Sequence, residues 1–268
     1  MTQSSQSALL RNNVRVVGSG AKTIVLAHGF GTDQTAWWRQ ESTLAAENRV
    51  VLFDHVGAGR SDPHAYSPHR YRSLHSYADD LLEILTELEV QDAVYVGHSM
   101  SGSIGVLAAV LSPERFSRMI FLNASPRYLN DGDYHGGFEQ SDIDNIYSAM
   151  TTNYQLWASG FAGMVMGNPE RMDLRQEFAA TLSAIRPDIA VAVSRIIFQS
   201  DYRAELPQLR IPTLIVQSSH DVAVPQSVGE YLARHIPRAE LMVIDAHGHL
   251  PHMSTPQTVL DAIRAFMR

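Results

Sequence analysis

The 268-residue sequence contains no cysteine, which excludes disulfide bridges, thiolate nucleophiles and cysteine-ligated zinc. It has no uninterrupted run of about 18 apolar residues, the length that a membrane-spanning helix needs. Lysine and arginine are outnumbered 21 to 28 by acidic residues and form no basic stripe, so we expect no nucleic-acid partner. The first residues, MTQSSQSALLRNN, lack the basic start and apolar stretch of a secretory signal. We therefore expect a cytoplasmic protein without membrane contact.

Short apolar runs and helical patterns alternate between Lys22 and Arg118. The runs are KTIVLAHG, RVVLFD and DAVYVGHS. They are almost wholly apolar, as expected for parallel strands that helices cover on both faces. Between them, residues 74–88 place apolar side chains at helical spacing, which predicts a helix with one buried face. The earlier run NVRVVGSG is predicted to be part of an antiparallel hairpin at the edge of the sheet.

The alternation breaks after a further predicted strand, RMIFLNAS. Residues 127–203 show helical patterns and no convincing strand, whereas IPTLIVQSS and ELMVIDA restore the strand pattern before a closing helix near Thr255–Met267. We therefore predict an α/β core in two parts, residues 1–126 and 204–268, interrupted by an inserted helical lid of residues 127–203. These residues are called the lid segment below.

The segment VYVGHSMSGSIG leads from a predicted strand directly into a predicted helix. Such a turn is typical of a nucleophile elbow, which lifts a serine hydroxyl above the sheet and needs small residues two before and two after it. Ser99 has Gly97 and Ser101 at these positions. The usual motif ends in glycine, so Ser101 is a departure that its small size permits. Ser99 is the predicted nucleophile.

A serine hydroxyl is a weak nucleophile, so it needs a base, and the base needs a carboxylate that orients it. In a chain with this elbow the three residues follow in the order Ser, Asp, His. Asp221 follows the strand LIVQSS, and His249 follows the strand LMVID. Because catalysis in open parallel sheets takes place at the carboxyl ends of the strands, Ser99, Asp221 and His249 are the predicted triad.

Each partner of Ser99 has rivals nearby. Asp245 competes with Asp221, but it lies within or at the end of a strand and close in sequence to the predicted base. His247 and His252 compete with His249, which is preferred because Gly248 frees the loop to turn the ring. His98 is interpreted as a packing or hydrogen-bonding residue. The spacing H-x-H-x-x-H around His249 superficially suggests a metal site, yet no second group of ligands is evident, and no metal or cofactor is expected.

The first predicted strand ends in the loop HGFG. We predict that this loop supplies the Phe30 amide to an oxyanion hole, in which the Met100 amide at the start of the helix that follows Ser99 is the second donor. Backbone donors perform this task, so the identity of the side chains matters less than the shape of the loop.

Several longer segments carry a resemblance to a known family: HGFGTDQTAW, YVGHSMS, SPRYLNDGDYHGGFEQ, RPDIA, FQSD and GHLPH. Over nearly its whole length the chain resembles the branch of the α/β-hydrolases that includes the bacterial stress regulator RsbQ and the plant strigolactone and karrikin receptors. The resemblance implies the α/β-hydrolase fold, the same triad and oxyanion amides, and a four-helix lid over an apolar pocket. The pocket residues that it implies are Tyr128, Phe138, Ile146, Trp157, Phe161 and Phe198.

An apolar, aromatic pocket above a serine triad favours small uncharged ligands. We therefore predict a serine hydrolase that cleaves small apolar carboxylic esters or lactones of the butenolide kind through an acyl-enzyme. The alternative is a ligand receptor or regulator, in which slow hydrolysis drives a lid-mediated interaction with a signalling protein. The lid sequence AGMVMGNPE replaces the more apolar APLAVG of the plant receptors, so ligand preference is not inherited from them.

Overall fold

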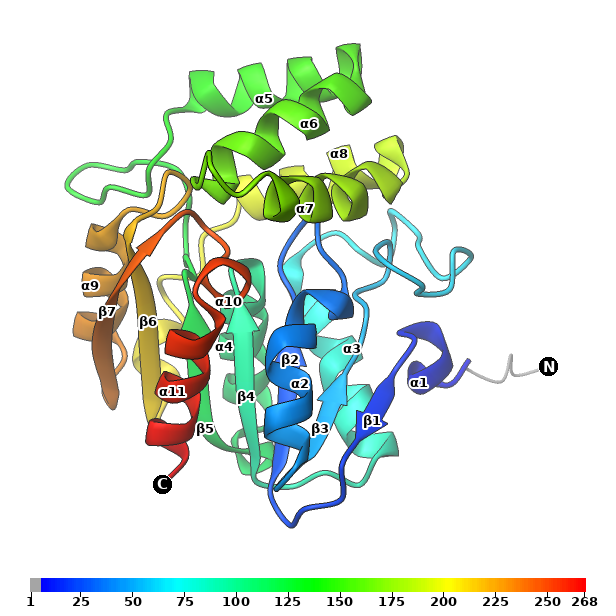
Figure 1. Cartoon of the computed structure of the whole chain (residues 1–268), viewed down its shortest axis with the longest axis vertical. Coiled ribbons are helices and arrows are strands. Elements are labelled where there is room, and N and C mark those ends of the chain that lie inside the picture. Colours follow the sequence, from blue (N-terminus) through cyan, green and yellow to red (C-terminus); the bar gives the residue numbers. More distant parts are fainter. Residues whose placement is uncertain (1–5) are drawn as a thin grey trace.

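The computed structural model describes residues 6–268, and within these residues seven strands form one sheet (Figure 1). The strands lie in the order β1-β3-β2-β4-β5-β6-β7, and all pairs are parallel except β1 with β3. The predicted α/β class with a mostly parallel central sheet is confirmed. The strands are β1 (Arg15–Val17), β2 (Thr23–Ala27), β3 (Arg49–Leu52), β4 (Ala93–His98), β5 (Phe116–Leu122), β6 (Thr213–His220) and β7 (Ala239–His247).

The predicted N-terminal hairpin is wrong in its pairing. β1 does form an antiparallel edge strand, but its partner is β3, with Arg15 opposite Leu52 and Val17 opposite Val50. The strand that follows β1 in sequence, β2, is hydrogen-bonded on both sides, to β3 and to β4. Because β2 has no free edge, β1 pairs with the next strand outward.

Helices cover both faces of the sheet. In β2, Ile24 and Leu26 belong to the apolar cluster under α2 and α11, whereas Val25 and Ala27 belong to the cluster shared with α3 and α4. Figure 1 shows α2 and α11 in front of the sheet and α3 and α4 behind it. This two-sided burial explains why the strands are apolar throughout. The helices of the core are α1 (Ala8–Arg11), α2 (Trp38–Ala45), α3 (Leu74–Glu87), α4 (Met100–Leu111), α9 (Gln226–His235), α10 (Pro251–Ser254) and α11 (Pro256–Met267).

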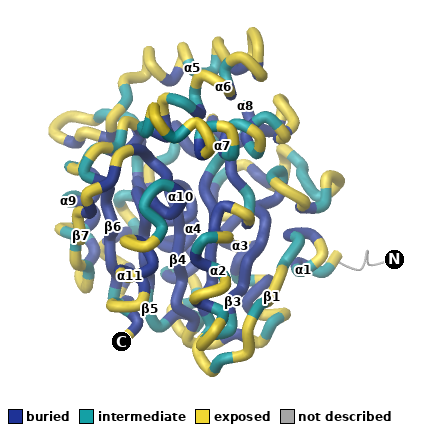
Figure 2. The backbone as a smooth tube through the Cα atoms, viewed as in Figure 1, coloured by how far each residue is buried: buried dark blue, intermediate teal, exposed yellow. Residues whose placement is uncertain are grey.

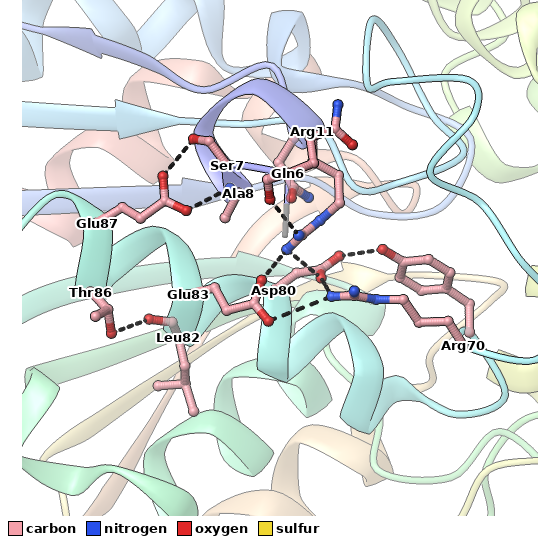
Figure 3. Close-up of polar contacts among 12 residues, drawn as sticks. Gln6, Ser7, Ala8, Arg11, Arg70, Asp80, Leu82, Glu83, Thr86 and Glu87 are labelled. Carbon is pink, nitrogen blue, oxygen red and sulfur yellow. Dashed lines mark hydrogen bonds and ion pairs between the residues drawn. The ribbon is translucent and has the colours of Figure 1, made fainter. Parts of the chain in front are cut away.

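The helix predicted over residues 74–88 is confirmed as α3, which also carries a buried charge. Asp80 is fully buried on α3, and its Oδ1 accepts hydrogen bonds from Arg11 at 2.8 Å and from Arg70 at 2.7 Å. The hydroxyl of Tyr71 donates to Oδ2 at 2.8 Å. Glu87 accepts from the amide of Ala8 at 2.6 Å (Figure 3). The contacts of Arg11 and Ala8 hold α1 against α3, which lies more than sixty positions later in the sequence.

Four helices occupy the lid segment within the described part of the chain. They are α5 (Gln140–Thr152), α6 (Tyr154–Met166), α7 (Met172–Ala184) and α8 (Pro187–Phe198). In Figure 1 they lie together across the end of the sheet toward which the β2 and β4 arrows point, and Figure 2 shows their outer sides exposed. No helix in residues 6–268 has the length and apolar character needed to cross a membrane.

Candidate active site

The turn between β4 and α4 holds Ser99 in a strained backbone conformation. Its φ is +56° and its ψ is −122°, in the region that non-glycine residues rarely adopt. A Cβ atom at Gly97 would lie 2.6 Å from the carbonyl oxygen of Ser101, so only glycine fits there. The strain and the close approach are those expected of a nucleophile elbow.

Ser101, the residue that departs from the usual motif, is fully buried and hydrogen-bonded. Its hydroxyl donates to the carbonyl of His28 at 2.5 Å, and His55 Nε2 lies 2.8 Å from Ser101 Oγ. Since the hydroxyl proton is directed at His28, His55 is the donor in the second bond. Ser101 therefore joins the elbow to the end of β2, a contact that glycine could not make.

Ser99, His249 and Asp221 lie in a continuous hydrogen-bonded chain. Ser99 Oγ is 2.8 Å from His249 Nε2, and His249 Nδ1 is 2.7 Å from Asp221 Oδ2. An ionised carboxylate only accepts, so Nδ1 carries the proton and Nε2 is free to accept from Ser99. The three residues follow β4, β6 and β7, which brings together side chains that lie up to 150 positions apart in the sequence.

The side chain of Asp221 is 0% exposed and has a fixed orientation. Its Oδ1 accepts from the amides of Ala223 at 2.8 Å and Val224 at 3.2 Å, which leaves Oδ2 for His249. The rival Asp245 is exposed on the edge strand β7, between the inward-facing Ile244 and Ala246. His249 Nδ1 is hydrogen-bonded to Asp221 and not to Asp245.

The two rival histidines are engaged elsewhere. His247 is exposed and stacks on His220 with ring centroids 4.4 Å apart. His252 is fully buried in α10 and stacks on Trp37 at 4.5 Å. Over residues 6–268, no three histidine or acidic side chains are grouped so that they could hold a metal ion.

His98, next to Ser99 in the sequence, is hydrogen-bonded to the backbone of His249. Its Nε2 donates to the carbonyl of His249 at 2.7 Å. Burial lowers the pKa of His98 well below its ordinary value, with further lowering from the neighbouring His252 and His249. A neutral His98 with its proton on Nε2 suits this contact.

The backbone amides of Phe30 and Met100 are available as donors. Met100 is the first residue of α4, where an amide has no carbonyl partner within the helix. In the described part of the chain, neither amide donates to another protein group. The loop before Phe30 is held by Thr32, whose hydroxyl donates to the carbonyl of Gly29 at 2.9 Å. This arrangement suits an oxyanion hole.

A narrow, apolar cavity lies above Ser99. Its volume is ≈ 30 Å³. Of the six pocket residues predicted from the resemblance, Tyr128, Phe161 and Phe198 line this cavity. The Tyr128 hydroxyl is 3.3 Å from Ser99 Oγ, and burial raises the pKa of Tyr128, so this group stays protonated.

The other three predicted pocket residues lie further out. Phe138 packs against Phe198 with ring centroids 5.7 Å apart. Ile146 and Trp157 line a larger surface groove between α5 and α6, which Phe161 also borders. The groove and the cavity thus share one aromatic side chain.

Sequence reasoning missed several residues that line the cavity. They are His98, Val165, Phe178, Ile197, Ala223 and Leu250. Most are apolar residues on helices of the lid segment or in loops. Their spacing alone does not distinguish a cavity wall from ordinary core packing.

Known proteins resemble this chain over almost its full length. The sequence matches the Alpha/beta hydrolase family over residues 24–262. It is 46% identical over 253 residues to the karrikin insensitive 2 receptor CA of Petunia hybrida, with 94% of each chain covered. It is 47% identical over 246 residues to a strigolactone esterase of Pisum sativum, covering 91% of this chain and 92% of the other. The solved structure of a hydrolase from Oleispira antarctica has a TM-score of 0.92 and 36% identity, covering 96% of both chains.

Proposed function

The chain belongs to the alpha/beta hydrolase family, and we propose that it hydrolyses small apolar carboxylic esters or lactones through an acyl-enzyme on Ser99. The observation that carries the proposal is the chain of two hydrogen bonds, 2.8 Å and 2.7 Å long, from Ser99 through His249 to Asp221. The similarity to plant karrikin receptors and strigolactone esterases confirms that part of the predicted resemblance.

The proposed reaction has two halves. His249 removes the proton of Ser99 as its Oγ attacks the carbonyl carbon, and the amides of Phe30 and Met100 stabilise the oxyanion. The bond from carbonyl carbon to the alkoxy oxygen then breaks, and His249 gives its proton to the leaving alcohol. A water molecule, deprotonated by His249, then attacks the carbonyl carbon of the acyl-enzyme; the bond from that carbon to Oγ breaks, and His249 returns the proton to Oγ, which releases the acid and a free Ser99. Asp221 stabilises the imidazolium that forms in each half.

The cavity supports a small, uncharged substrate. Most of its lining is aromatic or aliphatic, and the described lining residues include no lysine, arginine or carboxylate. A water molecule needs roughly 10–15 Å³ of cavity volume, so ≈ 30 Å³ holds only two or three. A larger ligand therefore requires side chains that line the cavity to move. The relatives named for strigolactone and karrikin make a butenolide the substrate to test first.

The experiment is labelling with a fluorophosphonate probe, peptide mass spectrometry, and turnover of short aryl esters and a butenolide. We expect the label on Ser99 and at least about a thousandfold loss of turnover in Ser99→Ala, the scale for removal of a triad member. Ser103→Ala is the matched control, because this buried hydroxyl lies on the same helix and donates to the carbonyl of Ser125. Full turnover by Ser99→Ala, or labelling at another residue, would overturn the proposal.

A second candidate function is that of a ligand receptor whose slow hydrolysis drives binding of a signalling protein. Its support is the exposed apolar surface of α6 beside the groove between α5 and α6, where Leu156 is 71% and Met164 50% exposed. A relative named as a receptor is 46% identical to this chain. A pull-down with and without a butenolide separates the two candidates, because fast turnover without a ligand-dependent partner favours the enzyme. The proposed location is the cytoplasm, which fractionation tests.

A further inference from the structure

We infer that Asn168 is a positioning residue that fastens the end of helix α6 to the loop carrying His249, and thereby keeps the His249 ring in place for the reaction. The inference rests on the proposed function and assigns it one more residue, outside the triad, the oxyanion amides and the cavity lining. It joins two segments that lie about eighty positions apart in the sequence.

The loop that carries His249 is held between the core and the lid segment. The amide of Gly248 donates to the carbonyl of His220 in β6 at 2.7 Å. The amide of His249 donates to the lid segment instead, to the carbonyl of Val165 in α6, at 2.8 Å. The backbone of the proposed base is therefore hydrogen-bonded to the lid segment itself.

Two glycines permit this close approach. Gly248 has a φ of +86°, and a Cβ atom there would lie 1.9 Å from the carbonyl oxygen of Met166. Gly167 ends α6 in the left-handed conformation, and a Cβ atom there would lie 2.8 Å from the Cα of Gly248. The two backbones touch where neither residue has a side chain, so a shift of the α6 end is transmitted directly to the loop.

Asn168 closes the junction with its side-chain amide. Its Nδ2 donates to the carbonyl of Met166 at 2.7 Å and to the carbonyl of His247 at 2.8 Å. One accepting group belongs to the last turn of α6 and the other to the residue two before His249. A single amide therefore spans both sides of the contact, using both of its N–H groups.

The other side of His249 is fixed to the core, where His98 donates to its carbonyl at 2.7 Å. The ring thus takes its position from a backbone with one anchor beside the nucleophile and one on α6. Reaction rates depend steeply on the geometry between base and nucleophile. Loss of the Asn168 bond to His247, which holds the loop against α6, should therefore slow the chemical step. Asn168 does not line the cavity, so substrate binding should change little.

The test compares Asn168→Ala, Asn168→Asp and wild type in ester turnover. We expect kcat to fall roughly fivefold in Asn168→Ala, the scale of the one ordinary hydrogen bond, to His247, that reaches the His249 loop, with KM changed by less than about twofold. Asn168→Asp keeps the shape but offers only acceptors to two carbonyl oxygens, so it should lose at least as much. A purely steric role would leave Asn168→Asp active.

Gln155→Ala is the matched control. Gln155 is exposed on α6, and its amide donates to the carbonyl of Ser183 at 3.3 Å, within the lid segment and away from the His249 loop. We expect its kcat to remain at the wild-type level. An equal loss in Gln155→Ala would mean general loosening of the lid segment, and would overturn the inference.

Hydrogen exchange at the His249 amide supplies a readout that does not need activity. In Asn168→Ala this amide should exchange faster while amides of β4 stay protected, and in wild type it should exchange together with the last amides of α6. Unchanged kcat, a rise in KM alone, or unchanged exchange at His249 would each overturn the inference. If wild type itself is neither labelled nor active, the proposed function fails, and the exchange data still decide whether Asn168 holds the loop.

Discussion

Replacing Asp221 by asparagine should disable the base without disturbing the fold. Oδ1 of Asp221 accepts from two backbone amides, those of Ala223 and Val224. An asparagine at this position has to present its carbonyl oxygen to them, which turns its Nδ2 toward His249 Nδ1, where the distance is now 2.7 Å. Because Nδ2 only donates, Nδ1 of His249 must become the acceptor and the ring proton must move to Nε2.

The magnitude follows from this exchange of tautomers. With the proton on Nε2, His249 faces Ser99 Oγ with a donor and has no lone pair to accept the hydroxyl proton. The same substitution in a serine triad lowers kcat about 10⁴-fold, which corresponds to ~5.5 kcal/mol of activation free energy at ~1.36 kcal/mol per tenfold. We expect a loss of this order in Asp221→Asn, with a thermal midpoint close to that of wild type.

The assay is hydrolysis of a short aryl ester, together with the rate of fluorophosphonate labelling at Ser99. Asp245→Asn is the matched control, because it makes the same change at the exposed carboxylate of β7 that sequence alone left as a rival. It should retain wild-type kcat. If Asp221→Asn keeps more than about a tenth of wild-type activity, or Asp245→Asn loses it, the assignment of the acid is refuted.

Two further predictions concern stability. Ser101→Gly restores the usual elbow motif but removes the hydroxyl that joins His28 and His55, so the free energy of unfolding measured in urea should fall by about 1–3 kcal/mol; an equal or higher stability would contradict the role given to Ser101. Burial lowers the pKa of His252 from 6.5 to about 3, so between these pH values the unfolded chain binds a proton that the folded chain does not bind. The free energy of unfolding should therefore decrease as the pH falls below 6.5, with His252 contributing up to ~1.4 kcal/mol per pH unit. His252→Phe should reduce that slope by nearly one proton in urea unfolding between pH 6 and pH 4, and an unchanged slope would show that His252 is not the group responsible.

The coupling between α6 and the His249 loop bears on both candidate functions. A partner or ligand that displaces α6 would also displace the backbone anchor of His249, through the bond to Val165. In an enzyme this contact keeps the His249 ring aligned with Ser99. In a receptor it would make turnover depend on the position of the surface that a partner binds. The Asn168 variants therefore report on either role.

The local part of the site was readable from the sequence. Strands covered on both faces are apolar throughout, so they can be recognised from their composition. A strand that leads into a helix through small residues can be recognised within about a dozen positions of the sequence. The carboxyl ends of parallel strands meet at one edge of the sheet. Because Ser99, Asp221 and His249 each follow a predicted strand, in the order expected for a triad, they could be expected to lie together. Each of these inferences depends on neighbours in sequence or on a general rule of sheet topology.

Tertiary structure alone decided the rest. β1 pairs with β3 because β2 has two partners already, which depends on the order of strands in space. Of the predicted pocket residues on α6, Phe161 reaches the cavity and Trp157 only the outer groove, although four positions on one helix separate them. The junction of Gly167 with Gly248 has no sequence signal, because two glycines far apart in a chain reveal their contact only when the backbones meet. Periodicity reports which face of an element is buried, and packing between distant segments determines what that face touches.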